Sequence, residues 1–378
     1  MELVYGKGLL LVLAFIVVEI LILHFIKKEK LPWKEMVLNA NSGHILLLIF
    51  RGVTLIVYAY VSGTFGWAGF KELPEIWQWI ITAISWDFAY YWSHRSHHEI
   101  PFLWRIHSIH HQGEHFSLSL GIRNSWFQNL TSAPFFLPLA FLGVPTELFL
   151  AVAAVHLFVQ FYNHNGIVNK SGILEKFMIT PSHHRVHHGS NPEYIDKNHG
   201  GTFVIWDKIF GTFKEEDPKI AIRYGTVEKI HTQHPFWANM LPLFQFFGFG
   251  RKGSKGANKF YAYTDAYIWS GAVLLFLLLV YYVNVEPVWT GMRELALFSS
   301  IFFGTLALGG IADGSRGGMV SWIGIWLMCP ILFPLLLHIQ GGWMLWLIPL
   351  MLAHASWGLR LLVKTEAQHK KEIALKIA

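Results

Sequence analysis

The sequence predicts an all-α protein: a polytopic membrane helix bundle with a histidine-rich helical cap. Three observations predict this class: apolar segments long enough to cross a bilayer, few charged residues, and histidines repeated at helical spacing. Hydrophobic residues make up 53% of the chain and charged residues only 14%, whereas a soluble domain carries about 25% charged residues. The single Cys329 excludes an intramolecular disulfide and any CxxC motif. The composition thus excludes an ordinary soluble protein, and we expect no nucleic-acid partner.

The membrane spans are predicted from apolar segments near the roughly 20 residues that a helix needs to cross hydrocarbon. The segment 133–163 is also apolar, but three prolines and Gly143 interrupt it. We therefore expect two helices there, which meet at a turn and leave on the side they entered. Glu19 and Arg51 lie inside spans and could face the bundle interior or reach the interface. The predicted spans are 8–26, 44–66, 75–92, 262–283, 295–311, 319–338 and 342–363.

The distribution of positive charge predicts the orientation. If the lysine-rich segment 27–34 lies in the cytoplasm and the spans alternate, nearly all of the 30 Lys and Arg fall inside or at inner span ends. This is the positive-inside pattern. It places the polar stretches 93–132 and 164–261 on the cytoplasmic face. The exceptions are Lys7, Lys71 and Arg293.

Histidines are concentrated in these two polar stretches. They form the patterns HRSHH at 94–98, HSIHH at 107–111 and HHRVHH at 183–188, with a further NHN at 163–165. Positions i, i+3 and i+4 share one face of a helix, so each pattern can point two or three imidazoles at one spot. Neutral imidazole is a good ligand for iron and zinc. The predicted metal ligands are His94, His98, His107, His110, His111, His164, His184, His187 and His188.

Nine ligand nitrogens are too many for one ion of usual coordination number, and they suit two ions about 3.5–4 Å apart. We therefore expect the cytoplasmic cap to hold a di-metal site. Chance or simple packing explains the pattern poorly, because HxxHH occurs at 107–111 and again at 184–188. A structural zinc pair and a pH-sensing cluster are the rival interpretations, although a pH sensor does not need the repeated spacing.

Three polar residues near these patterns are candidate catalytic residues that would support the ligands. Asp87 lies seven residues before His94 on the same helix face, where a carboxylate could orient the imidazole through its second nitrogen. Pairing with a nearby arginine is the alternative for this carboxylate. Glu114 follows the second pattern and could act in the same way. Gln160 lies four residues before His164 and could ligate a metal or form a hydrogen bond.

These patterns resemble the three histidine boxes of the fatty acid hydroxylase superfamily, which includes sterol desaturases, sterol C4-methyl oxidases, fatty acid 2-hydroxylases and carotenoid hydroxylases. The resemblance is stronger to the alkylglycerol monooxygenase subfamily, through TPSHHRVHHGSN at 180–191 and IDKNHGGTFVIWDKIFGTF at 195–213. It covers about 80–215 closely, and it is weaker from about 262 onward. Position 199 is His where that subfamily more often has Tyr.

The resemblance implies two iron ions on the nine histidines, O2 as co-substrate and a membrane lipid as substrate. For the subfamily it implies tetrahydrobiopterin as electron donor and hydroxylation of the ether carbon of alkylglycerol-type lipids. A reaction that does not depend on a pterin would need a partner that donates electrons. The alternatives are a sterol or fatty acyl hydroxylase or desaturase, and, in a different class, a non-enzymatic zinc-stabilised membrane protein. A metal transporter is disfavoured, because its ligands would lie within the spans.

The glycine-rich, basic stretch 248–258 predicts a boundary between two parts. Residues 1–250 would form the membrane-embedded di-iron catalytic domain, and residues 251–378 a C-terminal region of four spans. We expect an integral membrane protein whose active site faces the cytoplasm, in a bacterial inner membrane or, in a eukaryote, the endoplasmic reticulum.

Overall fold

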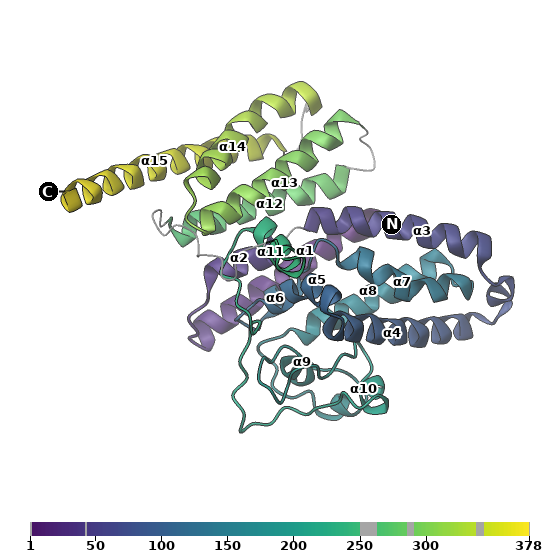
Figure 1. Ribbon diagram of the computed structural model, residues 1–378. Helices are drawn as coiled ribbons and strands as arrows, with labels where there is room; N and C mark the ends of the chain where they lie inside the picture. The colour runs from purple at the N-terminus through teal and green to yellow at the C-terminus, as the bar shows by residue number, and fades with distance from the viewer. Residues whose placement is uncertain (1, 42–43, 250–262, 286–290, 338–343, 378) are drawn as a thin grey trace.

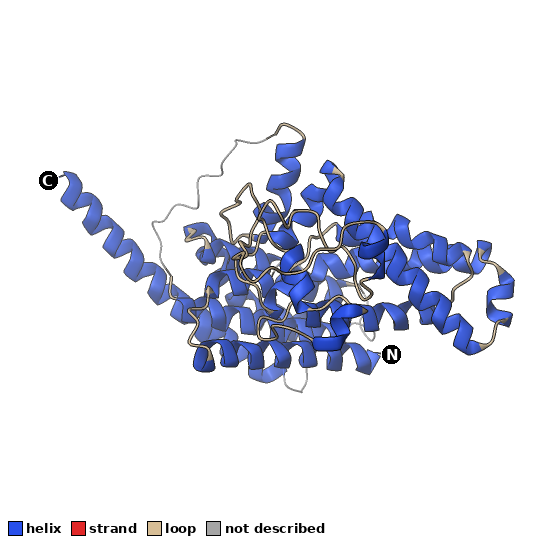
Figure 2. Ribbon diagram, turned by 90° about the horizontal axis from the view of Figure 1, so that it is seen from below, coloured by secondary structure: helices blue, strands red, loops and turns tan. Residues whose placement is uncertain are grey.

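A computed structural model of the protein describes residues 2–41, 44–249, 263–285, 291–337 and 344–377. Within these residues the chain is helical, and β structure is limited to an isolated bridge between Met178 and Phe203. Long helices pack side by side into a bundle, and a region of loops and short helices lies against one side of it (Figures 1 and 2). The all-α fold class predicted from the sequence is therefore confirmed.

Four helices form the N-terminal bundle: α3 (His44–Phe65), α4 (Glu75–Glu99), α7 (Gln128–Phe141) and α8 (Thr146–Asn163). They share one apolar core, so each helix buries one stripe and leaves its outer apolar face exposed. A short 3₁₀ helix, Ala68–Glu72, connects α3 to α4. The core contains Tyr58, Phe70, Trp86, Leu139, Val144 and Phe149.

α7 and α8 form the hairpin that the sequence predicts for 133–163. The Tyr58 hydroxyl donates to the Val144 carbonyl at 3.1 Å, which ties the tip of the hairpin to α3. Gly143 adopts φ +91°, and a Cβ there would lie 2.2 Å from the carbonyl oxygen of Trp67. Only glycine permits both this backbone conformation and this close approach.

Two further N-terminal helices lie between the bundle and the C-terminal part. α1 (Glu2–Leu21) continues as a π-helical turn (Ile22–Ile26), and α2 (Trp33–Ala40) follows. Residues from both helices are buried against α12, where the rings of Trp33 and Trp269 meet edge to face at 5.3 Å.

The histidine-rich cap is built from short helices whose starts are set by proline. Ile100 and Thr180 are extended residues, each followed by a proline at the first helical position. Proline suits this position because its fixed φ matches the helix and its missing N–H would have no helical partner. These elements are α5 (Pro101–His111), α6 (Leu118–Gly121), the 3₁₀ helix η3 (Gly172–Lys176), α9 (Pro181–His187), α10 (Ile205–Ile209) and α11 (Pro235–Phe246).

The C-terminal part is a second helical layer with its own core around the fully buried Trp322 and Trp326. Asn41 donates to the Thr305 carbonyl at 3.0 Å and so joins this layer to the N-terminal part. Its helices are α12 (Asp265–Val285), α13 (Met292–Ala312), α14 (Arg316–Leu337) and α15 (Met344–Ile377). The far end of α15 projects away from the rest of the molecule (Figure 1).

Five helices in the described part of the chain are long and apolar enough to cross a membrane, and they identify an integral membrane protein. α4 forms as expected over 75–92 but is not one of the five, which is consistent with its polar Gln78 and Asp87. α1 and α3 contain shorter apolar segments, Leu11–Ile26 and Ile49–Phe65. The five are Thr146–Asn163, Asp265–Tyr282, Glu294–Ala312, Arg316–Pro334 and Trp346–Gln368.

The predicted boundary at 248–258 lies almost wholly outside the described residues, which end at 249 and resume at 263. The division into parts 1–250 and 251–378 therefore stays a prediction.

Candidate metal centre

The nine predicted ligands come from four elements that meet at one place. His94 and His98 lie in the last turns of α4, beyond the predicted end of the span at 92. α5 carries three ligands in its second half, and α9 with its C-cap carries three more. His164 is the C-cap residue of α8. All nine residues are nearly inaccessible to solvent except His98, which is partly buried.

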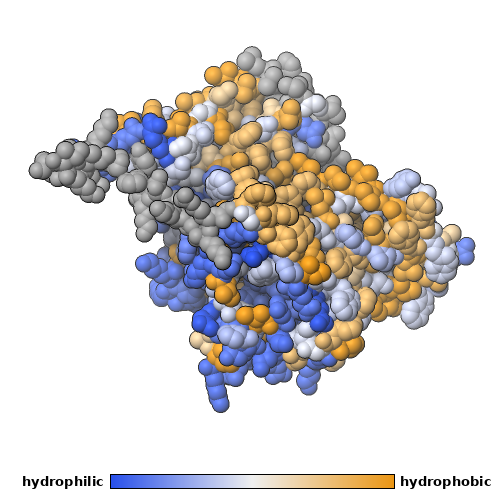
Figure 3. Space-filling view, viewed as in Figure 1, coloured by the Kyte–Doolittle hydropathy of each residue, from blue (hydrophilic) through white to orange (hydrophobic). Residues whose placement is uncertain are grey.

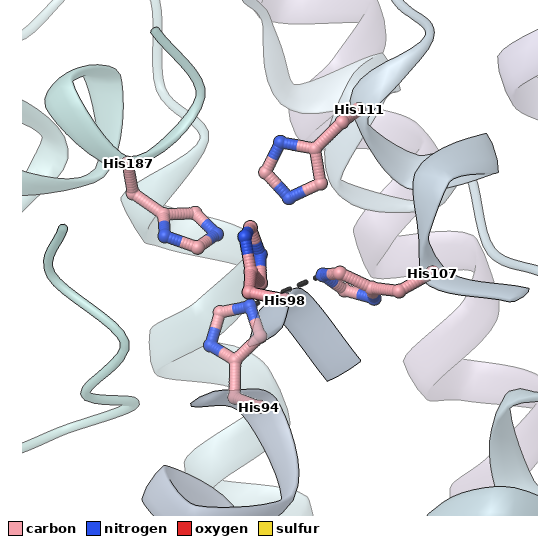
Figure 4. Close-up of side chains that lie close together, drawn as sticks. All are labelled: His94, His98, His107, His111 and His187. Carbon is pink, nitrogen blue, oxygen red and sulfur yellow. Dashed lines mark hydrogen bonds between the residues drawn. The ribbon is translucent and has the colours of Figure 1, made fainter. Parts of the chain in front are cut away.

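The structure sorts the nine imidazoles into two groups. Within each group, every residue offers one nitrogen, and these nitrogens all lie within 4.8 Å of one another. In the first group the rings point toward a common centre (Figure 4). The first group is His94, His98, His107, His111 and His187, and the second is His110, His164, His184 and His188.

Neighbouring residues in the chain belong to different groups. His110 and His111 are consecutive on α5 and divide between the two groups, as do His187 and His188 at the end of α9. The His111 and His188 rings stack at 4.3 Å, so the two groups are immediate neighbours. The HxxHH pattern therefore builds two adjacent sites from each helix, because residues i and i+1 point in directions about 100° apart.

The backbone fixes which nitrogen carries the proton in four of the nine rings. Nδ1 of His94 lies 2.8 Å from the His199 carbonyl, and Nδ1 of His187 lies 3.0 Å from the Lys197 carbonyl. His110 makes the same kind of contact with a carbonyl oxygen at 2.8 Å, and so does His164 at 2.7 Å. A carbonyl can only accept, so each Nδ1 donates and each neutral ring presents an unprotonated Nε2.

These unprotonated nitrogens face one another, which suits a cation between them. Nε2 of His110 lies 3.1 Å from Nε2 of His164. Each ring donates its one proton from Nδ1 to a carbonyl, so neither Nε2 carries a hydrogen. Nε2 of His187 is buried without a hydrogen-bond partner. Lone pairs in such contact repel, and buried unpaired acceptors are costly. The donor set therefore fits metal ions in both groups.

Burial keeps these imidazoles neutral. Desolvation is the largest cause that lowers the pKa of every ring in both groups, and neighbouring imidazoles lower the pKa of most of them further. The pKa of His110 falls to about 4. Only the neutral form can ligate a metal, so the site is ready to bind metal at neutral pH.

We expect acid to weaken both metal retention and folding stability. The folded pKa values lie below the ordinary value of 6.5, so the unfolded chain binds more protons between the two values. Stability from these rings is complete above pH 6.5 and decreases as the pH falls below it. Chelator competition at pH 7.5, 5.5 and 4 should show metal release that increases as the pH falls toward the folded pKa of about 4. Equal retention at all three pH values would contradict the account.

The structure places two of the three candidate supporting residues, Asp87 and Glu114, away from the ligand imidazoles. Asp87 does not orient a ligand imidazole; its carboxylate accepts from the backbone N–H of Thr202 at 2.8 Å and from the indole of Trp206 at 2.9 Å. This occurs because a loop from the cap covers the face of α4 on which His94 also lies. Glu114 is about half exposed and pairs with Lys229 at 2.8 Å, away from both groups.

Gln160 supports His164 through its backbone and not through its side chain. The Gln160 carbonyl accepts from His164 Nδ1, while its side-chain amide donates to the Gly201 carbonyl. Its side-chain oxygen accepts from the Tyr90 hydroxyl at 3.1 Å. The carboxylate that does lie beside a predicted ligand is Asp196, 3.5 Å from Nδ1 of His98.

The loop 196–200 is the feature that reasoning from the sequence missed. It supplies the carbonyls of Lys197 and His199, which fix ligands from two different helices. Asp196 and Asn198 adopt φ near +56° and +55°, a conformation that Asp and Asn tolerate better than other side chains. The pattern Asp-x-Asn at 196–198 was the available signal for this turn.

Asp207 holds the loop 196–200 in place. Its buried carboxylate accepts from the backbone N–H of His199 at 2.7 Å and of Gly200 at 2.8 Å. His199 itself is fully buried, with its ring 5.0 Å from that of His98, and burial lowers its pKa to about 3. It is not a member of either group of candidate ligands.

Asn198→Ala is expected to weaken the site. It removes side-chain hydrogen bonds to the carbonyls of His183 and Lys214, and it leaves alanine at positive φ. We expect a stability loss of about 2 kcal/mol and lower metal occupancy, since strain and lost buried hydrogen bonds add. Asn198→Gly keeps the backbone conformation and should lose less. Urea unfolding and metal analysis check this, and an alanine variant equal to the wild type would contradict it.

A pocket of about 420 Å³ opens onto the candidate metal centre. Its inner wall includes imidazoles of both groups, among them His98, His111 and His188. Charged side chains line its mouth, including Arg105 and Glu228, which pair at 3.1 Å. The centre is thus accessible through an opening that is lined by both charged and apolar side chains.

Comparison with known proteins finds a family model that matches this region. Residues 79–212 match the family described as Fatty acid hydroxylase, and this segment holds all nine candidate ligands. Alkylglycerol monooxygenase of Homo sapiens is 38% identical over 233 residues, covering 59% of this chain and 51% of the human protein. That of Danio rerio is 42% identical over 187 residues, covering 49% of this chain and 41% of the fish protein.

A bacterial relative also matches. Ornithine lipid hydroxylase OlsE of Rhizobium tropici is 32% identical over 161 residues, covering 42% of this chain and 48% of that protein. The chain spans about half the length of the curated relatives it matches. No solved structure matches the chain.

Proposed function

We propose that the protein is a membrane lipid monooxygenase that uses O2 and two iron ions held by the nine histidines. The match of residues 79–212 to the family described as Fatty acid hydroxylase supports this proposal. Hydroxylation of the ether carbon of alkylglycerol-type lipids is the favoured reaction, supported by the relatives with that activity in their names. A sterol or fatty acyl hydroxylase or desaturase of the same superfamily is the alternative.

The observation that carries this proposal is the convergence of unprotonated imidazole nitrogens in two adjacent groups. Bound iron would supply the redox chemistry that activates O2, which side chains alone cannot supply. A structural zinc site has four ligands in a closed tetrahedron. The first group offers five nitrogens and opens onto a pocket, and both features favour a reactive metal over zinc that only stabilises the fold.

Backbone carbonyls beside the two groups position the ligands, and a pocket gives the substrate access to them. Backbone carbonyls at 197 and 199 orient the imidazoles of α4 and α9. The pocket between α5, α9 and α11 has charged groups at its mouth, which suit the polar end of an amphiphilic lipid. Phe102 and Phe246 lie beside that mouth with ring centroids 5.6 Å apart, and they offer an apolar surface for the chain of such a lipid.

For the favoured substrate, one oxygen atom from O2 enters the C–H bond of the ether carbon and the other is reduced to water. Two electrons and two protons are required, and we propose tetrahydrobiopterin as their source. The hydroxylated carbon is a hemiacetal, which breaks down to an aldehyde and glycerol. If the pterin is not used, a partner that donates electrons would take its place.

We also propose that the centre faces the cytoplasm. The distribution of Lys and Arg supports this orientation, since the segments that carry the ligands lie on the same side as most of the positive charge. A bacterial inner membrane or an endoplasmic reticulum membrane would both accommodate it.

O2 consumption by the purified protein against a panel of lipids tests the proposed function. The panel contains alkylglycerols, acyl lipids and sterols, each with and without tetrahydrobiopterin. We expect turnover of alkylglycerol that requires the pterin and releases a fatty aldehyde. Turnover of a sterol or acyl lipid would favour the alternative. Protein that holds zinc, and gains no activity when iron replaces it, would support the non-enzymatic class.

A further inference from the structure

Six large apolar side chains lie exposed on the polar cap, where solvent-facing apolar groups are not expected in such number. They belong to η3, to α10 and to the residues that flank them, and their exposed fractions range from 36% to 64%. Figure 3 shows hydrophobic residues scattered among hydrophilic ones on this part of the molecule. We call these residues the apolar cap face: Ile173, Leu174, Phe177, Phe203, Ile205 and Ile209.

The apolar cap face is one rigid surface made of two segments. The backbone N–H of Ile179 donates to the Thr202 carbonyl at 2.9 Å, and that of Val204 donates to the Phe177 carbonyl at 3.1 Å. The Lys208 ammonium donates to the Lys176 carbonyl at 3.0 Å. These contacts hold η3 and α10 side by side.

This face continues the exposed apolar surface of α4. Exposed Ile76, Ile80, Ile84 and Phe88 recur every four residues and form a stripe along that helix. The ring of Trp206 on α10 packs against Phe88 at 4.9 Å. α10 therefore extends the stripe at its cytoplasmic end.

The position of α10 along α4 sets its depth. Phe88 lies four residues before the predicted end of the span at 92, which corresponds to about 6 Å along a helix. Amphipathic helices at a membrane surface bury their apolar face by about 5–10 Å. With α4 crossing the bilayer over 75–92 as the sequence predicts, α10 would lie at the level of the headgroup and acyl boundary.

The second helix beside this face is α8, one of the five helices able to span the membrane. Val155 and Phe158 expose 64% and 51% of their surface on its outer side. The hydroxyl of Tyr162 lies 3.5 Å from that of Ser171, immediately before η3. The apolar cap face is therefore flanked by lipid-facing surface on both sides.

We propose that the apolar cap face inserts into the cytoplasmic interface of the bilayer, so that the cap is bound to the membrane and not suspended above it. Lys176 lies exposed at the rim of the face, where a long cationic side chain can reach anionic headgroups. A second copy of the chain is a weaker candidate for covering this face, because the face is continuous with α8, a helix able to span the membrane, and with the exposed apolar stripe of α4.

Depth-dependent fluorescence quenching of the full-length protein in liposomes tests this proposal. Cys329 is the only cysteine and is 2% exposed, so single cysteines at the surface can be labelled selectively, with Cys329→Ala as background. Ile173→Cys and Ile209→Cys carry an environment-sensitive dye. The liposomes contain phosphatidylcholine and phosphatidylglycerol, with and without lipids that carry a nitroxide near the top of the acyl chain.

Two positions calibrate the measurement. Phe158→Cys on α8 should be quenched by the nitroxide lipids as a membrane-embedded control. Val227→Cys is a matched apolar control, because Val227 is 77% exposed but lines the polar pocket mouth. We expect the labels at Ile173 and Ile209 to be quenched to at least half the extent seen at Phe158, and the label at Val227 to remain unquenched.

The proposal would be overturned if the label at Phe158 is quenched but the labels at Ile173 and Ile209 remain as unquenched as the label at Val227. Pyrene at Ile209 reports the competing occupant, since excimer emission at high dilution in lipid would show that a second chain covers the face. That result would overturn membrane insertion equally. Neither outcome depends on the metal content or on the substrate.

Discussion

His187→Ala is expected to abolish O2-dependent lipid oxidation while leaving membrane insertion intact. Nε2 of His187 is buried and unpartnered, its ring lies 4.4 Å from that of His94, and its Nδ1 is fixed by the Lys197 carbonyl. Even the groups that orient a metal ligand contribute roughly 10–100-fold, so loss of a ligand should lower turnover by at least ~100-fold. The rate of O2 consumption and the metal content per chain are the measurements. His110→Ala should act in the same way through the second group.

His97→Gln is the matched control for this substitution. His97 is as buried as the ligands and adjacent to His98, but both its nitrogens have partners in the protein, Ser93 at 2.7 Å and Thr131 at 2.8 Å. We expect the control to retain its metal and most of its activity. Full activity in both the His187 and His110 variants would remove the metal-site interpretation.

Asp207→Ala is expected to cause the largest loss of stability. The carboxylate is fully buried and accepts hydrogen bonds from His199, Gly200 and the Thr212 hydroxyl, the last at 2.6 Å. Its removal leaves buried donors unpaired and frees the loop that orients His94. Each such group costs about 1–3 kcal/mol, so a loss of about 3 kcal/mol is expected. Thermal denaturation in detergent should show a midpoint lowered by roughly 5 °C.

Asp217→Ala serves as the comparison for Asp207, because its carboxylate is partly exposed and accepts only from the backbone N–H of Lys219 at 2.9 Å among the described contacts. Substitutions at such positions change stability by about 0.5 kcal/mol or less. The Asp207 variant that remains folded at low temperature should keep part of its activity. An unchanged midpoint for Asp207→Ala would show that the loop 196–200 is held by other contacts.

The sequence predicts the parts of this protein that depend on periodicity. Apolar segments near 20 residues identify the long helices. The repeated HxxHH pattern identifies the ligands, because a helix with that spacing must bring its imidazoles to one side. Their division into two adjacent groups was not predicted, because the spacing led us to expect each helix to point its imidazoles at one spot, whereas His110 and His111 divide between the groups.

Contacts between distant segments could not be predicted in this way. Asp87 shares a helix face with His94, as the spacing indicates, but whether a carboxylate meets an imidazole or a cap loop depends on tertiary packing. The carbonyls of Lys197 and His199 carry no signal at all, because every residue has a carbonyl. The Asp-x-Asn turn at 196–198 was visible, but its use in orienting two ligands appears only when α4 and α9 are brought together.

Metal analysis of protein purified under anaerobic conditions tests the central claim most directly. We predict two iron ions per chain, falling to one or none in His187→Ala and staying at two in His97→Gln. X-ray absorption at the iron edge should show the outer-shell scattering that is characteristic of imidazole ligands. A chain that binds no metal, or binds only zinc that iron cannot replace with gain of O2-dependent activity, would contradict the proposed di-iron centre.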